Sequence, residues 1–189
     1  MHEAHDEKKN SIFKIAINLA LTCLVAGVIL AAAYYITHPI ALEKEKEMTA
    51  KSMQALVPDA TAFTAVDGEE KMTAASADGK IVAYIVTVEP KGYGGAIVTQ
   101  VAVTPDGKVI NYKITKSNET PGLGENAKKE PFIGQFPGKT SEQLVVTKDA
   151  AKTENIQAMT GATITSKAVT KGVKEAVDRV NTYVGEGNK

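Results

Sequence analysis

The sequence contains a single cysteine, Cys23, which lies inside an apolar stretch near the N-terminus. One cysteine excludes an internal disulfide, and it cannot by itself hold an iron–sulfur cluster or a zinc ion. Cys23 is best interpreted as a small apolar residue that faces lipid or a neighbouring helix. Any redox chemistry of this chain therefore needs an organic cofactor or another subunit.

Histidine is equally scarce, because the chain has only His2, His5 and His38. After residue 38 no histidine is available as a general base or a metal ligand. A Ser/His/Asp or Cys/His nucleophile set cannot be built there, and a hydrolase with its own active site becomes hard to assemble. We therefore predict no catalytic residue and no metal site in the main part of the chain.

An excess of charge of either sign is also missing. Lys and Arg together number 22, Asp and Glu also number 22, and the formal net charge is zero. The sequence has no Lys/Arg-rich run of the kind that binds phosphate backbones. This argues against nucleic acid as a partner.

The sequence does contain one long apolar run, residues 15–37, which has no charged residue. A helix rises ~1.5 Å per residue, so this run can span a hydrocarbon core of ~30 Å. Tyr34 and Tyr35 lie near its end, where aromatic rings favour the headgroup region, and His38-Pro39 then ends the apolar pattern. The apolar region of a signal peptide is shorter, ~7–15 residues. We therefore predict a retained single-pass anchor that contacts membrane lipid.

The lysines around this run indicate its orientation. Lys8, Lys9 and Lys14 precede the run, whereas residues 43–47 after it carry mixed charge. Cytoplasmic flanks are enriched in Lys and Arg. We therefore predict that residues 1–14 are cytoplasmic and that the domain after the anchor lies on the outer face of the cell membrane.

The remaining sequence divides into a stalk and one domain. Residues 38–58 have a helix-forming composition and predict a stalk helix that ends before Pro58. Residues 59–189 are predicted to form a single domain. Within it the interpretation of residues 61–75 remains open.

Three segments of this domain predict strands. Residues 81–88 and 96–103 are rich in β-branched side chains, and residues 109–115 alternate after a turn signal at 105–108, so the last two strands form a hairpin. Residues 144–146 predict a short fourth strand.

The last segment, residues 166–184, predicts an amphipathic helix, because five valines fall on one side of it: Val169, Val173, Val177, Val180 and Val184. Strands followed by a helix that packs on them indicate an α+β domain with an antiparallel sheet and packed helices.

Glycine-rich loops are what the domain offers for ligand binding. They occupy residues 91–95 (Lys-Gly-Tyr-Gly-Gly), 119–125 (Glu-Thr-Pro-Gly-Leu-Gly-Glu) and 159–166 (Met-Thr-Gly-Ala-Thr-Ile-Thr-Ser). Each loop alone has a purely structural interpretation: a hairpin loop, a type II turn and a helix cap, respectively. The third loop can also bind an anion, because free N–H groups and the helix dipole favour a phosphate there.

In this order and behind an N-terminal anchor, the three loops resemble the FMN-binding family. That family includes the G subunits of Rnf ion-translocating complexes, which this chain resembles most, and the related C subunits of the Na⁺-translocating NADH:quinone reductase. The resemblance runs from the anchor to Val184. It implies an FMN-binding domain behind a transmembrane helix.

The resemblance also implies a covalent cofactor. In the family, FMN is joined through its phosphate to the last Thr of a Ser/Thr-Gly-Ala-Thr motif. Here that motif is Thr160, Gly161, Ala162 and Thr163, so Thr163 is the implied attachment residue. Thr165 and Ser166 are the neighbouring alternatives, which we expect to cap the helix instead.

The second loop matches the Glu-Thr-Pro-Gly-Leu-Gly loop of the family. The residues implied to contact the flavin are Glu119, Thr120, Gly122, Leu123 and Gly124.

One position departs from the family pattern. The flavin-transferase motif usually has an Asp three residues before its Ser/Thr, and this chain has Gln157 there. The missing carboxylate bears on recognition by the transferase and not on the acceptor hydroxyl. A Thr hydroxyl is a weak nucleophile, so attachment in trans by a flavin transferase with Mg²⁺ is expected.

The function implied is that of an electron-carrying subunit, not catalytic alone, in a Rnf-type ferredoxin:NAD oxidoreductase complex that moves Na⁺ or H⁺. Its partners would be the other subunits of that complex. Three alternatives are the equivalent subunit of the Na⁺-translocating NADH:quinone reductase, a membrane-tethered module that binds an anionic ligand reversibly, and a structural subunit whose flavin loops are relics.

Overall fold

The computed structural model describes residues 3–149 and 151–187. The chain forms two compact units, Met1–Met48 and Thr49–Lys189. The first is the greater part of one long helix, and the second is a globular α+β domain.

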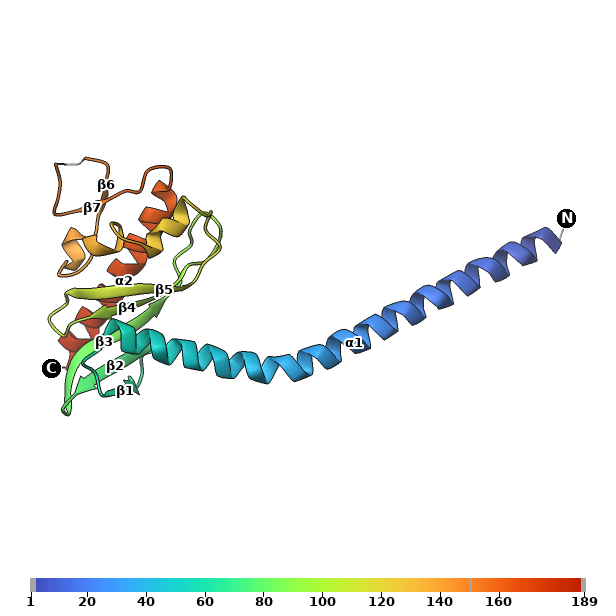
Figure 1. Ribbon diagram of the computed structural model, residues 1–189, viewed down its shortest axis with the longest axis horizontal. Coiled ribbons are helices and arrows are strands. Elements are labelled where there is room, and N and C mark those ends of the chain that lie inside the picture. The colour runs from blue at the N-terminus through green and yellow to red at the C-terminus, as the bar shows by residue number, and fades with distance from the viewer. Residues whose placement is uncertain (1–2, 150, 188–189) are drawn as a thin grey trace. The chain divides into compact units, whose positions relative to one another are not determined.

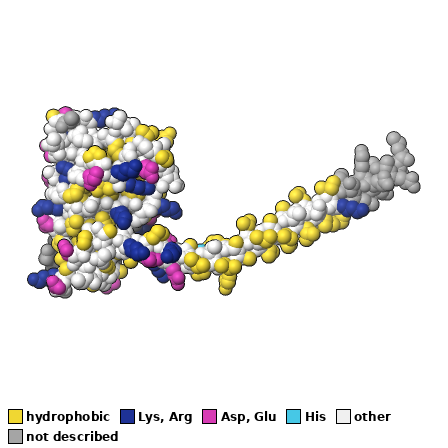
Figure 2. Space-filling model, in the orientation of Figure 1, with side chains coloured by type: hydrophobic (Ala, Val, Ile, Leu, Met, Phe, Trp, Pro, Cys, Tyr) yellow, Lys and Arg dark blue, Asp and Glu magenta, His cyan; other side chains and the backbone are white. Residues whose placement is uncertain are grey.

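The long helix, α1, extends over Glu3–Leu56. Its segment Phe13–Leu56 is long and apolar enough to cross a membrane by length and composition. The large apolar side chains from Phe13 to Ile36 are exposed, and Figure 2 shows them along the visible face of the helix. Pro39 lies inside α1 and does not end it, although it removes one backbone donor. The predicted end of the stalk helix before Pro58 is confirmed.

The globular unit contains a five-stranded antiparallel sheet in the order β1-β2-β3-β4-β5 (Figure 1). Its strands are β1 Ala62–Ala65, β2 Met72–Ala77, β3 Lys80–Val88, β4 Val98–Val103 and β5 Val109–Lys116. The three predicted strands correspond to β3, β4 and β5, and the predicted hairpin is the β4–β5 pair. The first two strands come from the segment whose interpretation was open.

One face of the sheet is covered by α2, which extends over Thr163–Gly187. Val169, Val173, Val177 and Val180 are fully buried against strand residues such as Val101, whereas Val184 is half-buried. The predicted amphipathic helix is confirmed, but it begins at Thr163 and not at residue 166.

The other face of the sheet is covered by the end of α1. Leu56 and Val57 pack there in a second apolar cluster with Ile85 and with alanines of β2, β3 and β4. Ser52, one turn earlier, is also buried. The last turns of α1 are therefore part of the globular unit.

Short elements connect β5 to α2. They are the 3₁₀ helices η1 Gly124–Lys128, η2 Ile133–Gln135 and η3 Ser141–Gln143, and the strands β6 Val146–Thr147 and β7 Ile156–Gln157. The predicted strand at 144–146 overlaps β6 only at Val146, and β6 pairs in parallel with β7 outside the main sheet. Phe132 and Phe136 from this segment complete the core on the α2 side.

Candidate functional site

The three glycine-rich loops, far apart in sequence, meet at one cavity of about 720 Å³. This volume falls in the range of ~300–1,000 Å³ typical of small-molecule sites. The first loop contributes Tyr93, and the segment after β6 contributes Lys148. The second and third loops contribute the remaining lining residues: Glu119, Thr120, Leu123, Gly124, Gly161, Ala162, Thr163, Ile164 and Thr165.

Most of the predicted site residues line this cavity. Thr160 and Gly122 are the exceptions, because they lie in the same loops but outside the lining set. Four further residues line the cavity and were not predicted to bind the cofactor: Tyr93, Lys148, Ile164 and Thr165. Tyr93 lies within a predicted loop and Ile164 follows the predicted attachment residue, so their positions gave a signal, whereas no sequence feature singles out Lys148.

The third loop places Thr163 at the first position of α2. Gly161 precedes it with φ +74°, a conformation that side chains with a Cβ rarely adopt, and Leu123 Cδ2 lies 3.1 Å from where such a Cβ would be. Thr163 is half-buried on the cavity wall. Because the first N–H groups of a helix have no partner within it, this wall favours an anion.

Thr165 and Ser166 were expected to cap the helix, and the structure corrects this. Both lie inside α2 and are buried. Ser166 Oγ accepts a hydrogen bond from the Met159 N–H at 3.0 Å and donates to the Ala162 carbonyl at 2.9 Å, so it ties the loop to the helix. Thr165 Oγ1 donates to the Glu119 carboxylate.

The second loop begins with a β-turn. The Leu123 N–H donates to the Thr120 carbonyl at 3.1 Å, and Gly122, at the third position of the turn, has φ +77°. This agrees with the type II turn that Pro-Gly predicts. Asn126 Nδ2 donates to the Gly122 carbonyl at 2.8 Å and fixes the turn from the side of η1. Thr120 and Leu123 are thereby held on the cavity wall.

The mouth of the cavity is apolar and exposed. Tyr93, Leu123 and Ile164 are 73%, 44% and 56% exposed, and together they form a group of large apolar side chains that the folded domain leaves uncovered. The charged lining residues are Glu119, whose carboxylate is buried, and Lys148, which is exposed. An apolar mouth with an anion-binding helix start suits a ligand that combines a planar ring with a phosphate.

The residue that departs from the family pattern, Gln157, is well integrated in β7. Its Nε2 donates to the carbonyls of Asp149 and Lys152 at 3.0 and 3.1 Å. An aspartate at this position could not donate either bond. Gln157 therefore supports the loop that precedes the third glycine-rich segment, outside the cavity itself.

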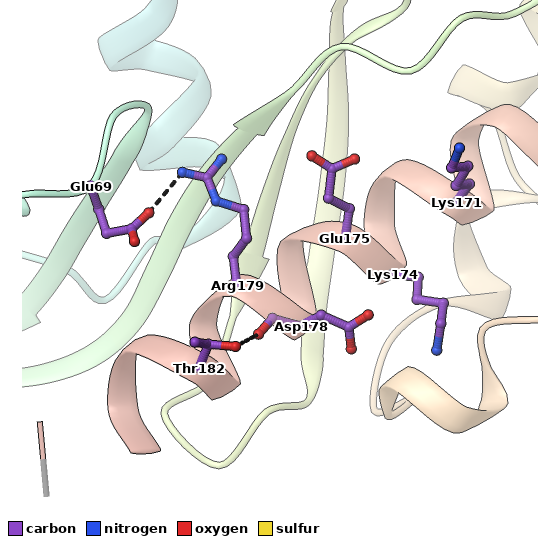
Figure 3. Close-up of a pocket in the computed structure, with 7 residues that line it drawn as sticks. All are labelled: Glu69, Lys171, Lys174, Glu175, Asp178, Arg179 and Thr182. Carbon is purple, nitrogen blue, oxygen red and sulfur yellow. Dashed lines mark hydrogen bonds and ion pairs between the residues drawn. The ribbon is translucent and has the colours of Figure 1, made fainter. Parts of the chain in front are cut away.

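A second cavity, of about 480 Å³, lies on the outer side of α2 (Figure 3). Arg179 points across it to Glu69, with 2.8 Å between Nη2 and the carboxylate, and also donates to the Glu70 carbonyl. Lys174 donates to the Ser141 carbonyl. Arg179 and Lys174 are thus already engaged by the protein, and no glycine-rich loop lines this cavity, so the first cavity is the better candidate. No metal-binding group of three or more His, Cys, Asp or Glu occurs in the residues the structure describes.

Comparison with known proteins matches residues 92–178 to the family described as "FMN-binding domain". The chain is 56% identical over 182 residues to the G subunit of the proton-translocating ferredoxin:NAD(+) oxidoreductase complex of Clostridium ljungdahlii, covering 96% of this chain and 98% of the relative. It is 34% identical to the G subunit of the Na(+)-translocating ferredoxin:NAD(+) oxidoreductase complex of Acetobacterium woodii, covering 88% and 90%.

Two solved structures share the fold. One is the C subunit of the Na(+)-translocating NADH-quinone reductase from Parabacteroides distasonis, with a TM-score of 0.50 and 24% identity over 60% of this chain and 61% of that one. The other is NqrC from Shewanella oneidensis, with a TM-score of 0.51 and 18% identity over 69% and 73%.

Proposed function

Because this chain belongs to the family of G subunits of ion-translocating ferredoxin:NAD(+) oxidoreductase complexes of the Rnf type, we propose that it relays electrons within such a complex through FMN bound covalently to Thr163. The observation that carries the proposal is the meeting of three glycine-rich loops at one cavity whose wall includes the first residue of α2. The order of the loops along the chain and their amino-acid composition do not by themselves require the three loops to meet in space.

The residues of the cavity fit FMN. The N-terminus of α2 suits the phosphate, and the exposed ammonium of Lys148 lies on the same cavity. The apolar side chains of Leu123 and Ile164 line the cavity and can pack against an isoalloxazine ring. When bound, FMN supplies the electron-transfer chemistry, and this chain supplies position and electrostatics.

Attachment needs a second protein. A phosphoester forms between Thr163 Oγ1 and the phosphorus of an activated flavin nucleotide, as the bond from that phosphorus to its leaving group breaks. The leaving group departs to solvent, and the hydroxyl proton must pass to a base. The carboxylate on the cavity wall, Glu119, already accepts bonds from Gly94 and Thr165. We therefore propose that a flavin transferase with Mg²⁺ supplies both the base and the metal. The acceptor hydroxyl lies on the wall of the cavity and is only half-buried, which suits an approach from outside.

Helix α1 indicates where in the cell the electron transfer would take place. The helix anchors the chain in the cell membrane, and the lysines before residue 15 favour a cytoplasmic N-terminus with the flavin domain on the outer face. Electrons would then be exchanged with neighbouring subunits of the complex. A covalent bond suits the outer face, where free FMN would be diluted away.

The test is the intact mass of the full chain co-expressed with a flavin transferase. Wild type should gain the mass of FMN less one water and keep its yellow colour on denaturation. Thr163→Val removes the hydroxyl and keeps the shape, so this variant should gain no mass. Thr182→Val, the same substitution on the exposed side of α2, is the matched control and should gain it.

Fragmentation of the peptide that spans residues 153–167 should place the added mass on Thr163. Added mass in Thr163→Val would refute the attachment residue. Colour that is lost on denaturation would instead support reversible binding of an anionic ligand.

A further inference from the structure

Among the described residues on the wall of the flavin cavity, Glu119 is the one acidic residue, and it is buried, with 8% of the residue exposed. A buried carboxylate is costly unless its oxygens accept hydrogen bonds. Here Oε1 accepts from the Gly94 N–H at 2.9 Å, and Oε2 accepts from Thr165 Oγ1. Both oxygens of the carboxylate are thus engaged by the protein itself.

These two bonds join segments that are far apart in the chain. Gly94 lies 25 residues before Glu119, in the first loop, and Thr165 lies 46 residues after it, in the third. Glu119 itself opens the second loop. A single side chain therefore connects all three glycine-rich loops at the place where they form the cavity.

The glycines around Glu119 give a second, independent observation. A Cβ added to Gly92 would collide with Oε1 of Glu119, and one added to Gly124 would collide with Oε2. Neither glycine has a positive φ, so backbone conformation does not require a glycine at either position. The carboxylate oxygens occupy the space that a Cβ would need, and Ile97 beside Gly92 and Thr165 beside Gly124 crowd the same positions. The loops are therefore glycine-rich partly because they close around this side chain.

We propose that Glu119 is a positioning residue that assembles the flavin cavity before the cofactor is attached, an inference that rests on the flavin site proposed above. Its bond to Thr165 fixes the first turn of α2, and Thr163 lies two residues earlier in that same turn. Its bond to Gly94 holds the loop that carries Tyr93. In this role the side chain acts through the loops, because both of its oxygens are bonded to loop residues.

The first test needs no flavin. Amide hydrogen exchange is measured on the full chain in detergent, produced without transferase. Glu119→Ala should speed exchange of the Gly94 amide on the order of tenfold or more, because its acceptor is lost. Glu119→Gln keeps a carbonyl acceptor and should stay near wild type, as should Glu142→Gln, a control at an exposed glutamate. Unchanged Gly94 exchange in Glu119→Ala would overturn the proposal.

A second variant tests the proposal even if Glu119→Ala fails to fold. Thr165→Val removes only the donor to Glu119, and it should speed exchange of the Ser166 amide, which bonds to the Ala162 carbonyl at the start of α2. Slow exchange of the Val177 amide shows in each variant that the core is intact. If Ser166 exchange does not change in Thr165→Val, the link to the third loop is wrong.

The second test measures the rate of flavin attachment with a fixed amount of transferase. Glu119→Ala should slow attachment severalfold, and Glu119→Gln should restore most of the rate, because it keeps an acceptor for the Gly94 N–H. Equal rates in all three proteins would refute the positioning role. If wild type itself carries no flavin, the proposed function fails, and the exchange measurement still decides the role of Glu119.

Discussion

At the scale of single residues, Leu123 shows how the chain can influence its cofactor without bonding to it. Its side chain lies on the cavity wall, 44% exposed, and packs toward Gly161 of the third loop. It therefore bridges two of the three loops at the mouth. The polarity of this one side chain should affect the reduction potential of a flavin bound there.

Leu123→Glu should lower the flavin midpoint potential and leave covalent attachment intact. A unit charge at about 6 Å in a water-like dielectric contributes ~0.7 kcal/mol, which is roughly 30 mV for a one-electron step. The added carboxylate disfavours the more negative, reduced flavin. Redox titration of the purified protein measures the shift, with Leu123→Gln as the neutral control. Identical potentials in the two variants would show that Leu123 is remote from the ring.

At the level of residues, the sequence pointed to the motifs but not to the contacts that join them. The second and third loops were recognised from Thr-Pro-Gly and Thr-Gly-Ala-Thr, whose residue types are tied to local geometry. The pairing of Glu119 with Gly94 and Thr165 was not predictable, because it depends on the approach of segments separated by 25 and 46 residues. For the same reason Thr165 and Ser166 were wrongly expected to be caps.

At the scale of elements, the content of β-branched residues explains which strands could be predicted from the sequence. β3 is rich in Val and Ile and β4 in Val, and such β-branched residues favour strands. β2 reads Met-Thr-Ala-Ala-Ser-Ala, and alanine is depleted in strands, so this segment gave no signal. Its alanines serve packing: Ala75 is fully buried where the end of α1 lies on the sheet.

The contact between β5 and η1 offers a test of how the second loop is supported. Tyr112 of β5 is buried, and its hydroxyl donates to the Ala127 carbonyl of η1 at 2.6 Å. Burial, followed by the nearby charge of Glu130, raises the pKa of Tyr112. The hydroxyl therefore stays protonated in the folded domain at a pH where it ionises in the unfolded chain.

Tyr112→Phe should lower the free energy of unfolding by about 1 kcal/mol at pH 7, because the Ala127 carbonyl loses its partner. The pKa is raised on folding, so the contribution of Tyr112 is present below pH ~10 and is lost as the pH rises further. Urea denaturation at pH 7 and pH 11 measures both effects. The difference between wild type and variant should shrink at pH 11, and a constant difference would contradict this account.

At the scale of the whole molecule, relatives of this protein bear names that differ in the translocated ion, a proton in one and Na⁺ in another. Residues 15–37 contain no Asp, Glu, Lys or Arg that could bind either ion within the membrane. This chain is similar to both relatives, and it combines an apolar helix with an FMN-binding domain.

The orientation of the anchor is open to a direct test. A reporter that is active only in the cytoplasm, fused after Lys189, should be silent if the domain lies on the outer face, as the lysine bias predicts. The same reporter fused before Met1 is the control and should be active. A strong signal from the C-terminal fusion would reverse the topology.

The burial of the end of α1 decides where the chain can be truncated. A soluble fragment that starts at residue 59 would lack Leu56 and Val57, whose burial contributes roughly 1.5–3 kcal/mol each, and would expose Ile85 and Ala102 to solvent. We expect that fragment to aggregate, whereas one that starts at Thr49 should remain monomeric in size-exclusion chromatography. Equal behaviour of the two would mean that the helix end is dispensable. The membrane anchor therefore cannot be removed at the proline that follows the helix without uncovering the underside of the sheet.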